Sequence, residues 1–393
     1  MPDAGLVAQA AAGGLAKATA PVETRIFNTL DGMRGVAALV VAMLHTPSFT
    51  RASLFGDRDG FQCAFLGVDL FFVLSGFVIA HAYEQRLQTG MRLTAFLKYR
   101  AHRLAPLYVL GVLLAVAEMT ASNWAHPGPW TPSRLAIVGV AALVMIPLPI
   151  FGFGQVMYLL NPATWTLAAE LVVNLVYALI ARYLTTPRLI GVCLAAGLGV
   201  AWVSWRYGTI DVGISWSLFP AGLILATYGF FTGVLMFRLH RSRAPTRGLS
   251  GWLWMGMLFV VLMAPLSGPV LPPYEVACAL VLFPALVYAA ACSTLGPLGL
   301  KICATAGTVS YALYVLHTPI GRTVVVIASV LHWNIATGAA GLALVALFVA
   351  VSWAADVFYD RPVRRWLKRL DRRRPPFSWP DRDRRSEPRT LQA

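Results

Sequence analysis

Long apolar stretches, separated by short polar segments, form the main pattern of this chain. Each stretch has roughly the 18 to 25 residues with which an α-helix crosses a bilayer. Backbone polar groups in lipid must be satisfied within such a segment, which favours helices. The pattern therefore predicts an all-α fold, a polytopic membrane helix bundle. The stretches lie near residues 33–50, 64–83, 104–121, 134–151, 164–182, 188–205, 215–237, 249–267, 276–294, 305–329 and 336–358.

The basic segments between the stretches predict how the helices are oriented. Positive residues favour the cytoplasmic side, which places Arg86–Arg103, Arg238–Arg247 and the chain from Arg361 there. Five apolar stretches lie between the first two basic segments, although an even number must cross. The stretch 134–151 runs into prolines and glycines, so we expect it to be re-entrant. About ten transmembrane helices remain, with both termini cytoplasmic.

The two ends of the chain differ in composition from its middle. Residues 1–26 are rich in alanine and glycine and lack a basic segment followed by a compact apolar one, which predicts a disordered N-terminal extension. Residues 27–360 form the integral-membrane domain. Residues 361–393 are dense in arginine and proline and are expected to form a basic cytoplasmic tail, solvated or lying against membrane lipid.

Composition argues against a soluble domain, a nucleic-acid-binding protein and a cysteine metal site. Hydrophobic residues make up 58% of the chain and charged ones 12%, unlike an ordinary soluble domain. The net charge of +15 comes from loops and the tail, so membrane lipid is the expected partner and nucleic acid is not. The five cysteines have no C-x-x-C spacing, so no metal site is predicted.

The first apolar stretch, LDGMRGVAALVVAMLHT, carries two ionisable residues, Arg34 and His45. Eleven positions of an α-helix bring both to within about 20° of one face, about 16 Å apart along the axis. Ionisable residues inside a membrane are costly and mark functional sites by default. His45 is the best candidate for a catalytic base, because imidazole titrates near neutrality.

Other ionisable residues are predicted at a depth similar to that of His45. With the orientation above, Asp69, Glu170 and His317 fall in the same outer half of the membrane. A carboxylate next to an imidazole fixes its tautomer and stabilises the imidazolium. Asp69 or Glu170 is therefore expected to orient His45, although either could instead serve helix packing.

The remaining candidates have both functional and structural explanations. Arg34 at the cytoplasmic end could bind a phosphate-bearing ligand or anchor the helix at the interface. Arg100 and Arg103 are spaced i, i+3 in FLKYRAHRLAP and form either a phosphate clamp or ordinary positive-inside charge. Trp165 is a substrate platform or an interfacial belt residue. Tyr311, like His317, contacts the acceptor or belongs to a polar packing seam.

Six blocks of this sequence resemble the acyltransferase 3 family of membrane O-acyltransferases, in the single-domain branch. LDGMRGVAALVVAMLH is similar to its Arg-x10-His signature, and GVDLFFVLSGFVIA, FLKYRAHRLAPLY and WTLAAE to its next blocks. SYALYVLHTP and DRPVRRWLKR resemble its C-terminal blocks. The resemblance extends in order from about residue 25 to 370. Thr166 stands in place of the usual serine, and Asn174 where an aromatic residue often follows.

The resemblance implies an enzyme that moves an acyl group, expected to be acetyl from acetyl-CoA, onto a hydroxyl of a cell-surface or lipid-linked carbohydrate. His45 is then the essential catalytic residue, and Arg34, Arg100 and Arg103 face the CoA phosphates. The expected location is the bacterial inner (plasma) membrane. The alternative is a proton-coupled secondary transporter of a sugar or drug-like molecule, with the same polar residues as a proton relay. The sequence leaves open the acyl chain, the acceptor, the oligomeric state, and whether an acyl-histidine intermediate forms.

Overall fold

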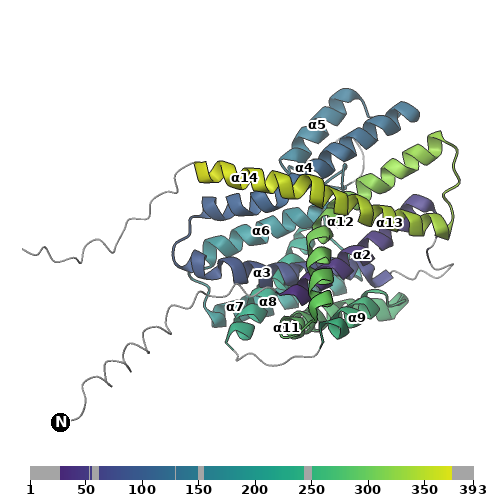
Figure 1. Cartoon of the computed structure of the whole chain (residues 1–393). Coiled ribbons are helices and arrows are strands. Elements are labelled where there is room, and N and C mark those ends of the chain that lie inside the picture. The colour runs from purple at the N-terminus through teal and green to yellow at the C-terminus, as the bar shows by residue number, and fades with distance from the viewer. Residues whose placement is uncertain are drawn as a thin grey trace, which may run out of the picture.

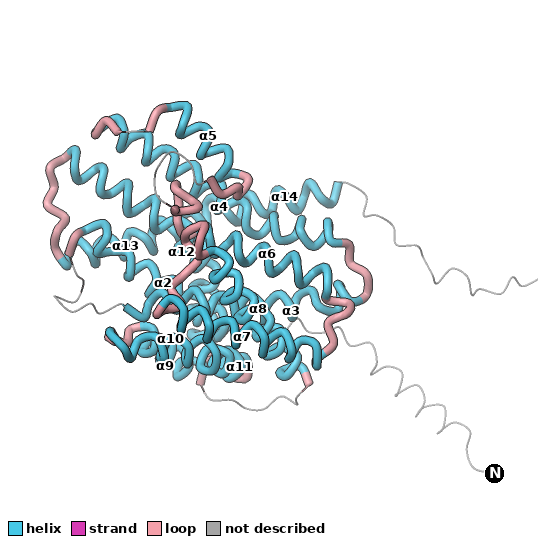
Figure 2. Tube along the Cα trace, turned by 180° about the vertical axis from the view of Figure 1, so that it is seen from behind, coloured by secondary structure: helices cyan, strands magenta, loops and turns pink. Residues whose placement is uncertain are grey.

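The chain folds into a bundle of helices packed side by side (Figures 1 and 2). The computed structural model describes residues 27–52, 54, 62–128, 130–148, 155–242 and 250–373. The expected extension 1–26 and the tail beyond residue 373 lie outside the described residues. Within these ranges the regular elements are all helical, and β-structure is limited to two isolated bridges. The predicted all-α fold is confirmed.

The first half of the bundle consists of α2 (Asn28–Thr50), η2 (Gln62–Leu66), α3 (Gly67–Gln88), α4 (Leu93–Ala125), α5 (Pro132–Leu143), α6 (Thr164–Ile180) and α7 (Thr186–Tyr207). The second half consists of α8 (Phe219–Arg241), α9 (Gly251–Leu262), η3 (Gly268–Val270), α10 (Leu271–Ala277), η4 (Cys278–Leu282), α11 (Phe283–Ala291), α12 (Pro297–Val330), α13 (Gly338–Ala355), η5 (Asp356–Asp360) and α14 (Arg361–Arg373). The π-helical turn η4 joins α10 and α11, and the π-helical turn η5 joins α13 and α14.

Seven helical stretches within the described residues are long and apolar enough to cross a membrane. Three further apolar helices, α5, α6 and α9, have 12 to 17 residues. Helix α2 has 23 residues but carries Arg34 and His45 within its apolar stretch, and it is not among the seven. A multi-pass membrane bundle follows from these lengths, and the number of about ten spans stays a prediction.

The stretch 134–151 differs from the long helices, as its prolines and glycines indicate. Its helix, α5, has 12 residues, which gives about 18 Å at 1.5 Å per residue and falls short of a bilayer core. A turn and irregular backbone follow to residue 148. Helix α5 packs against α4, where the Tyr108 hydroxyl donates to the Ala142 carbonyl at 2.5 Å. Figure 2 shows α5 at the edge of the bundle.

The C-terminal helices form one continuous rod, α13–η5–α14 (Figure 1). The carboxylates of Asp356 and Asp360 are buried in the π-turn. Arg361 lies 2.6 Å from Asp356, and Arg364 lies 2.5 Å from Asp360. The helix continues through residue 360, so the first part of the predicted basic tail, up to Arg373, belongs to this rod.

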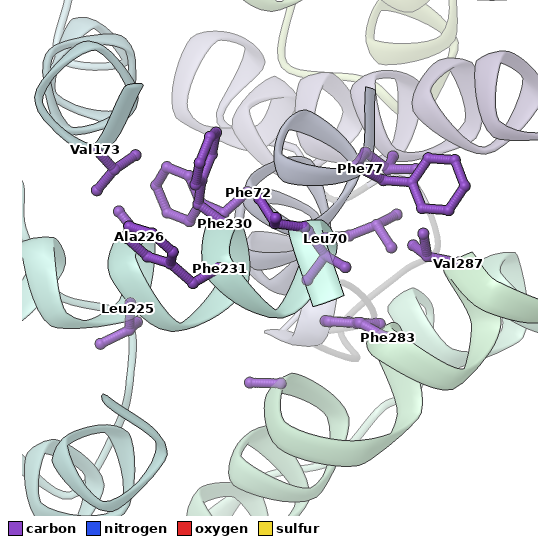
Figure 3. Close-up of a cluster of buried hydrophobic side chains, with 14 of the residues drawn as sticks. Leu70, Phe72, Phe77, Val173, Leu225, Ala226, Phe230, Phe231, Phe283 and Val287 are labelled. Atoms are coloured by element: carbon purple, nitrogen blue, oxygen red, sulfur yellow. The ribbon is translucent and has the colours of Figure 1, made fainter. Parts of the chain in front are cut away.

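Two close helix pairs bring the rest of the bundle together. Helix α12, with 34 residues, packs along α2 and also contacts α4 and α13. Helices α3 and α8 pack face to face around Phe72, Phe77, Phe230 and Phe231 (Figure 3). Small residues let helices approach closely in membranes, where packing rather than hydrophobic transfer drives association.

Three glycines set the distance between α3 and α8. A Cβ at Gly76 would collide with the Phe230 backbone, and one at Gly233 would collide with the backbone of Val73 and Phe77. A Cβ at Gly229 would lie 2.7 Å from the Phe72 side chain. Because backbone atoms cannot move aside as side chains can, larger residues here must push the two helices apart.

We predict that Gly233→Val destabilises the protein by roughly 1–3 kcal/mol or more, the usual cost of overpacking. Thermal unfolding of the protein in detergent would measure this as a lowered midpoint. Gly191→Ala in α7 is the matched control, since nothing lies within 4 Å of a Cβ there and alanine favours helix over glycine. An unchanged midpoint for Gly233→Val would contradict the close packing of α3 on α8.

Candidate functional site

Two cavities lie inside the bundle, one at each end of the stripe that joins Arg34 to His45. The arginine cavity has a volume of about 220 Å³, and its wall includes Arg34, Arg100, Arg103, Glu170 and Tyr311. The histidine cavity has a volume of about 610 Å³, and its wall includes His45, Asp69, Trp165 and His317. Every residue predicted as part of the site from the sequence therefore lines one of these two cavities.

Helices α2 and α12 supply residues to both cavities. Arg34 and His45 come from α2, while Tyr311, Tyr314 and His317 follow one another on α12 at three-residue spacing. That spacing keeps the three rings on one side of a helix. Since α2 and α12 pack along each other, both helices run from the arginine cavity to the histidine cavity.

His45 is oriented by a second histidine. The ring of His45 stacks on the ring of His317 with a centroid distance of 5.1 Å and an angle of 18° between planes. Nδ1 of His317 lies 3.1 Å from the Leu313 carbonyl, and Nε2 lies 3.2 Å from the Thr318 hydroxyl. A carbonyl only accepts, so Nδ1 of His317 carries a proton and donates to Leu313. His317 is therefore held by its own helix, with its ring face against His45.

Asp69 and Trp165 stand in the wall of the same cavity. Asp69 is buried and lines the cavity with His45, but the structure forms no hydrogen bond between the two within the described residues. The Trp165 ring rests against Gly213 and Gly222, where added Cβ atoms would collide with it. This glycine cradle fixes one side of the indole and leaves it in the cavity wall, which suits the platform interpretation of Trp165.

The arginine cavity combines paired and unpaired guanidinium groups. Arg100 binds Glu170 at 2.6 Å, and Arg34 binds Asp31 at 2.9 Å. The guanidinium of Arg103 makes no hydrogen bond or ion pair at these distances with any described residue, although Asp360 attracts it electrostatically. Its donors remain available to a ligand in the cavity.

The structure corrects the roles predicted for Glu170 and Tyr311. Glu170 does not orient His45: its carboxylate accepts hydrogen bonds from Arg100 and, at 2.7 Å, from Ser75, and it lines the arginine cavity. Tyr311 does not face the predicted acceptor side either. It lines the arginine cavity, and its hydroxyl donates to the Leu104 carbonyl at 2.8 Å. Both residues lie nearer the arginines than their sequence positions suggested.

Sequence reasoning missed four residues in the histidine cavity, Glu118, Asp211, Tyr314 and Arg322. Glu118 and Arg322 interrupt apolar stretches, a signal that applied to them as well as to Asp69. Asp211 is accessible in the loop between α7 and α8, and the protein around it raises the pKa of its carboxyl because partial desolvation disfavours the charged form. Tyr314 carried no charge to draw attention to it.

Comparison with known proteins agrees with this geometry. Residues 27–357 match the family described as "Acyltransferase domain". The chain belongs to this acyltransferase family. A curated relative, "Protein 2 in picA locus" of Rhizobium radiobacter, is 42% identical over 162 residues, which is 39% of this chain and 81% of the relative. No solved structure matches.

Membership of the acyltransferase family bears on the transporter alternative. The matched region, residues 27–357, contains every residue that lines either cavity. The chain is thus a membrane acyltransferase, and family membership favours acyl transfer over transport as its activity.

We predict that breaking the Arg100–Glu170 pair lowers the stability of this acyltransferase. Glu170→Leu leaves the part-buried Arg100 without its partner; breaking a fully buried pair costs about 3–5 kcal/mol, so we expect a smaller loss here. Adding Arg100→Leu removes the uncompensated charge, so we expect the double variant to unfold at a higher temperature than Glu170→Leu alone. Thermal unfolding in detergent measures both. A double variant that is less stable than the single one would show that the two groups are not coupled as the 2.6 Å contact indicates.

Proposed function

We propose that this acyltransferase moves an acyl group, with acetyl the expected one, from cytoplasmic acyl-CoA to a hydroxyl of a cell-surface or lipid-linked carbohydrate. One observation carries the proposal: a cavity in which Arg103 has no ion-pair partner among the described residues adjoins, along the same two helices, a cavity with a stacked histidine. Phosphate recognition in the arginine cavity and proton transfer in the histidine cavity are thus separate but adjoining. The inner membrane of a bacterium is the proposed location.

The arginine cavity suits the donor. Arg34, Arg103 and Arg364 repel one another electrostatically, and an anion among them offsets that repulsion. Arginine is well matched to phosphate oxygens because its planar fork donates two parallel hydrogen bonds. The cavity volume of about 220 Å³ suits a slender chain such as the pantetheine arm, which leaves the nucleotide outside it.

The histidine cavity suits a hydroxyl-bearing acceptor. At about 610 Å³ it is the roomier of the two, and its wall combines the Trp165 indole with Asp69, Glu118, Asp211 and Arg322. Pockets for small molecules typically join an apolar or aromatic wall to a few polar groups that fix orientation. An aromatic face with carboxylates around it offers both stacking and hydrogen-bond acceptors for sugar hydroxyls.

In the proposed reaction His45 acts on the acceptor hydroxyl. His45 takes the hydroxyl proton as the oxygen attacks the thioester carbonyl, the C–S bond breaks, and the proton passes to the leaving thiolate. The stacked ring of His317 holds the His45 imidazole in position during this step. In an alternative order His45 first receives the acyl group and then passes it to the hydroxyl.

The proposal predicts separate effects for the two cavities. His45→Ala should lower transfer of labelled acetyl from acetyl-CoA by about 10²–10⁴-fold, the usual contribution of a general base. Arg103→Ala should raise KM for acetyl-CoA more than it lowers kcat, because contacts to the CoA phosphates stabilise the bound substrate and the transition state equally. Membranes with endogenous lipid-linked glycan and matched protein levels serve for the assay.

His332→Asn is the control, because His332 lies exposed in the turn after α12 and lines neither cavity. Its backbone φ of 55° is one that asparagine also adopts. Full activity is expected for this variant. Labelled glycan formed at the wild-type rate by His45→Ala would overturn the mechanism.

A further inference from the structure

The two cavities meet at two side chains. Val68 of α3 and Tyr314 of α12 line both the arginine cavity and the histidine cavity. Any group that travels from the arginines to His45 through the cavities must pass between them. Val68 is a short, stiff β-branched side chain, whereas the long Tyr314 side chain can swing about χ1.

Tyr314 is held across this junction by contacts of its hydroxyl and of its ring. The Thr166 hydroxyl donates to the Ala163 carbonyl at 2.9 Å. The Tyr314 hydroxyl lies 2.7 Å from the Thr166 oxygen and also donates to the Ala163 carbonyl, at 3.5 Å. The ring has Phe71 edge-on at 5.5 Å and the ring of His317 at 6.2 Å. Hydrogen bonds to Thr166 and to the Ala163 carbonyl, at the start of α6, thus hold the phenol in place.

We propose that Tyr314 is a partition between the arginine cavity and the histidine cavity. Its side chain swings aside when the acyl-bearing arm of the donor passes and otherwise keeps the two cavities separate. This inference rests on the proposed function. The closed position separates a cavity lined by arginines from one lined by histidines and carboxylates. The open position gives the thioester access to His45. Tyr314 is in this sense a positioning residue that controls which nucleophile meets the thioester.

The partition has a chemical consequence for water. Without it, water beside His45 competes with the acceptor: its oxygen bonds to the thioester carbonyl carbon, the C–S bond breaks, and the thiolate takes the proton, giving free carboxylic acid and CoA. Exclusion of water is a general way in which enzymes suppress hydrolysis of reactive groups. A tyrosine that fills the junction reduces this loss whenever no acceptor is bound.

Three substitutions of Tyr314 test the proposal with purified protein in detergent and acetyl-CoA labelled in its acetyl group. Tyr314→Ala should release labelled acetate without acceptor several-fold faster than the wild type. Tyr314→Phe, which keeps the ring and loses the hydrogen bond to Thr166, should fall between them. Tyr314→Trp should block passage, abolishing both acetate release and transfer, while binding of the nucleotide half of CoA stays at the wild-type level.

Tyr228→Ala controls for general loosening, because Tyr228 of α8 also donates its hydroxyl to a backbone carbonyl but lines neither cavity. Equal acetate release by Tyr228→Ala and Tyr314→Ala would overturn the partition. So would wild-type transfer by Tyr314→Trp. Failure of the proposed function looks different: the wild type and Arg103→Ala would then hold the nucleotide equally well, whatever Tyr314 does.

Discussion

The packing of α2 along α12 is the interaction on which the rest of the site depends. Helix α2 carries a guanidinium and an imidazole through an apolar stretch, and neither group can face lipid at low cost. Helix α12 covers both, with Tyr311 and Tyr314 near the arginine end and His317 against His45. Small residues make the contact close: a Cβ on Gly35 would collide with Ala306, and one on Gly307 with Asp31. The polar stripe and the helix that covers it are therefore one structural unit.

Charge pairing then decides which arginine is available. Arg34 and Arg100 each have a carboxylate within 3 Å, supplied by Asp31 one turn away and by Glu170 from another helix. Arg103 lies among Arg34, Arg364 and Asp360 without a direct partner among the described residues. Pairing holds two guanidiniums in defined positions at low cost, and leaving the third unpaired keeps a cationic site for a ligand. The rod α13–η5–α14 contributes through Asp360 and Arg364, which explains why the helix continues beyond residue 360.

Much of the architecture was predictable because it follows from local sequence. Helical character, the weak stretch 134–151 and the shared face of Arg34 and His45 all depend on periodicity and length, which a single stretch contains. The partner of Glu170 was not predictable in this way. Its carboxylate meets Arg100, 70 positions away, and the choice between Arg100 and His45 depends on the depth at which α6 packs against α8, α3 and α4. A shift of a few residues in depth lies within the uncertainty of segment boundaries, and it changes the partner completely.

Dependence on distant neighbours also explains why Tyr314 could not be predicted as a site residue. A charged residue in an apolar stretch is a signal in the sequence itself, whereas a tyrosine there is common and gains a role only from the residues around it. Its role comes from position: three residues after Tyr311 and three before His317, it lies between the cavities to which those two residues belong. Helical rise alone separates the arginine end from the histidine end by about 16 Å along α2. A reaction that keeps its phosphates at one end and its proton transfer at the other needs a connection between them, and Tyr314, which lines both cavities, is the side chain we propose to control it.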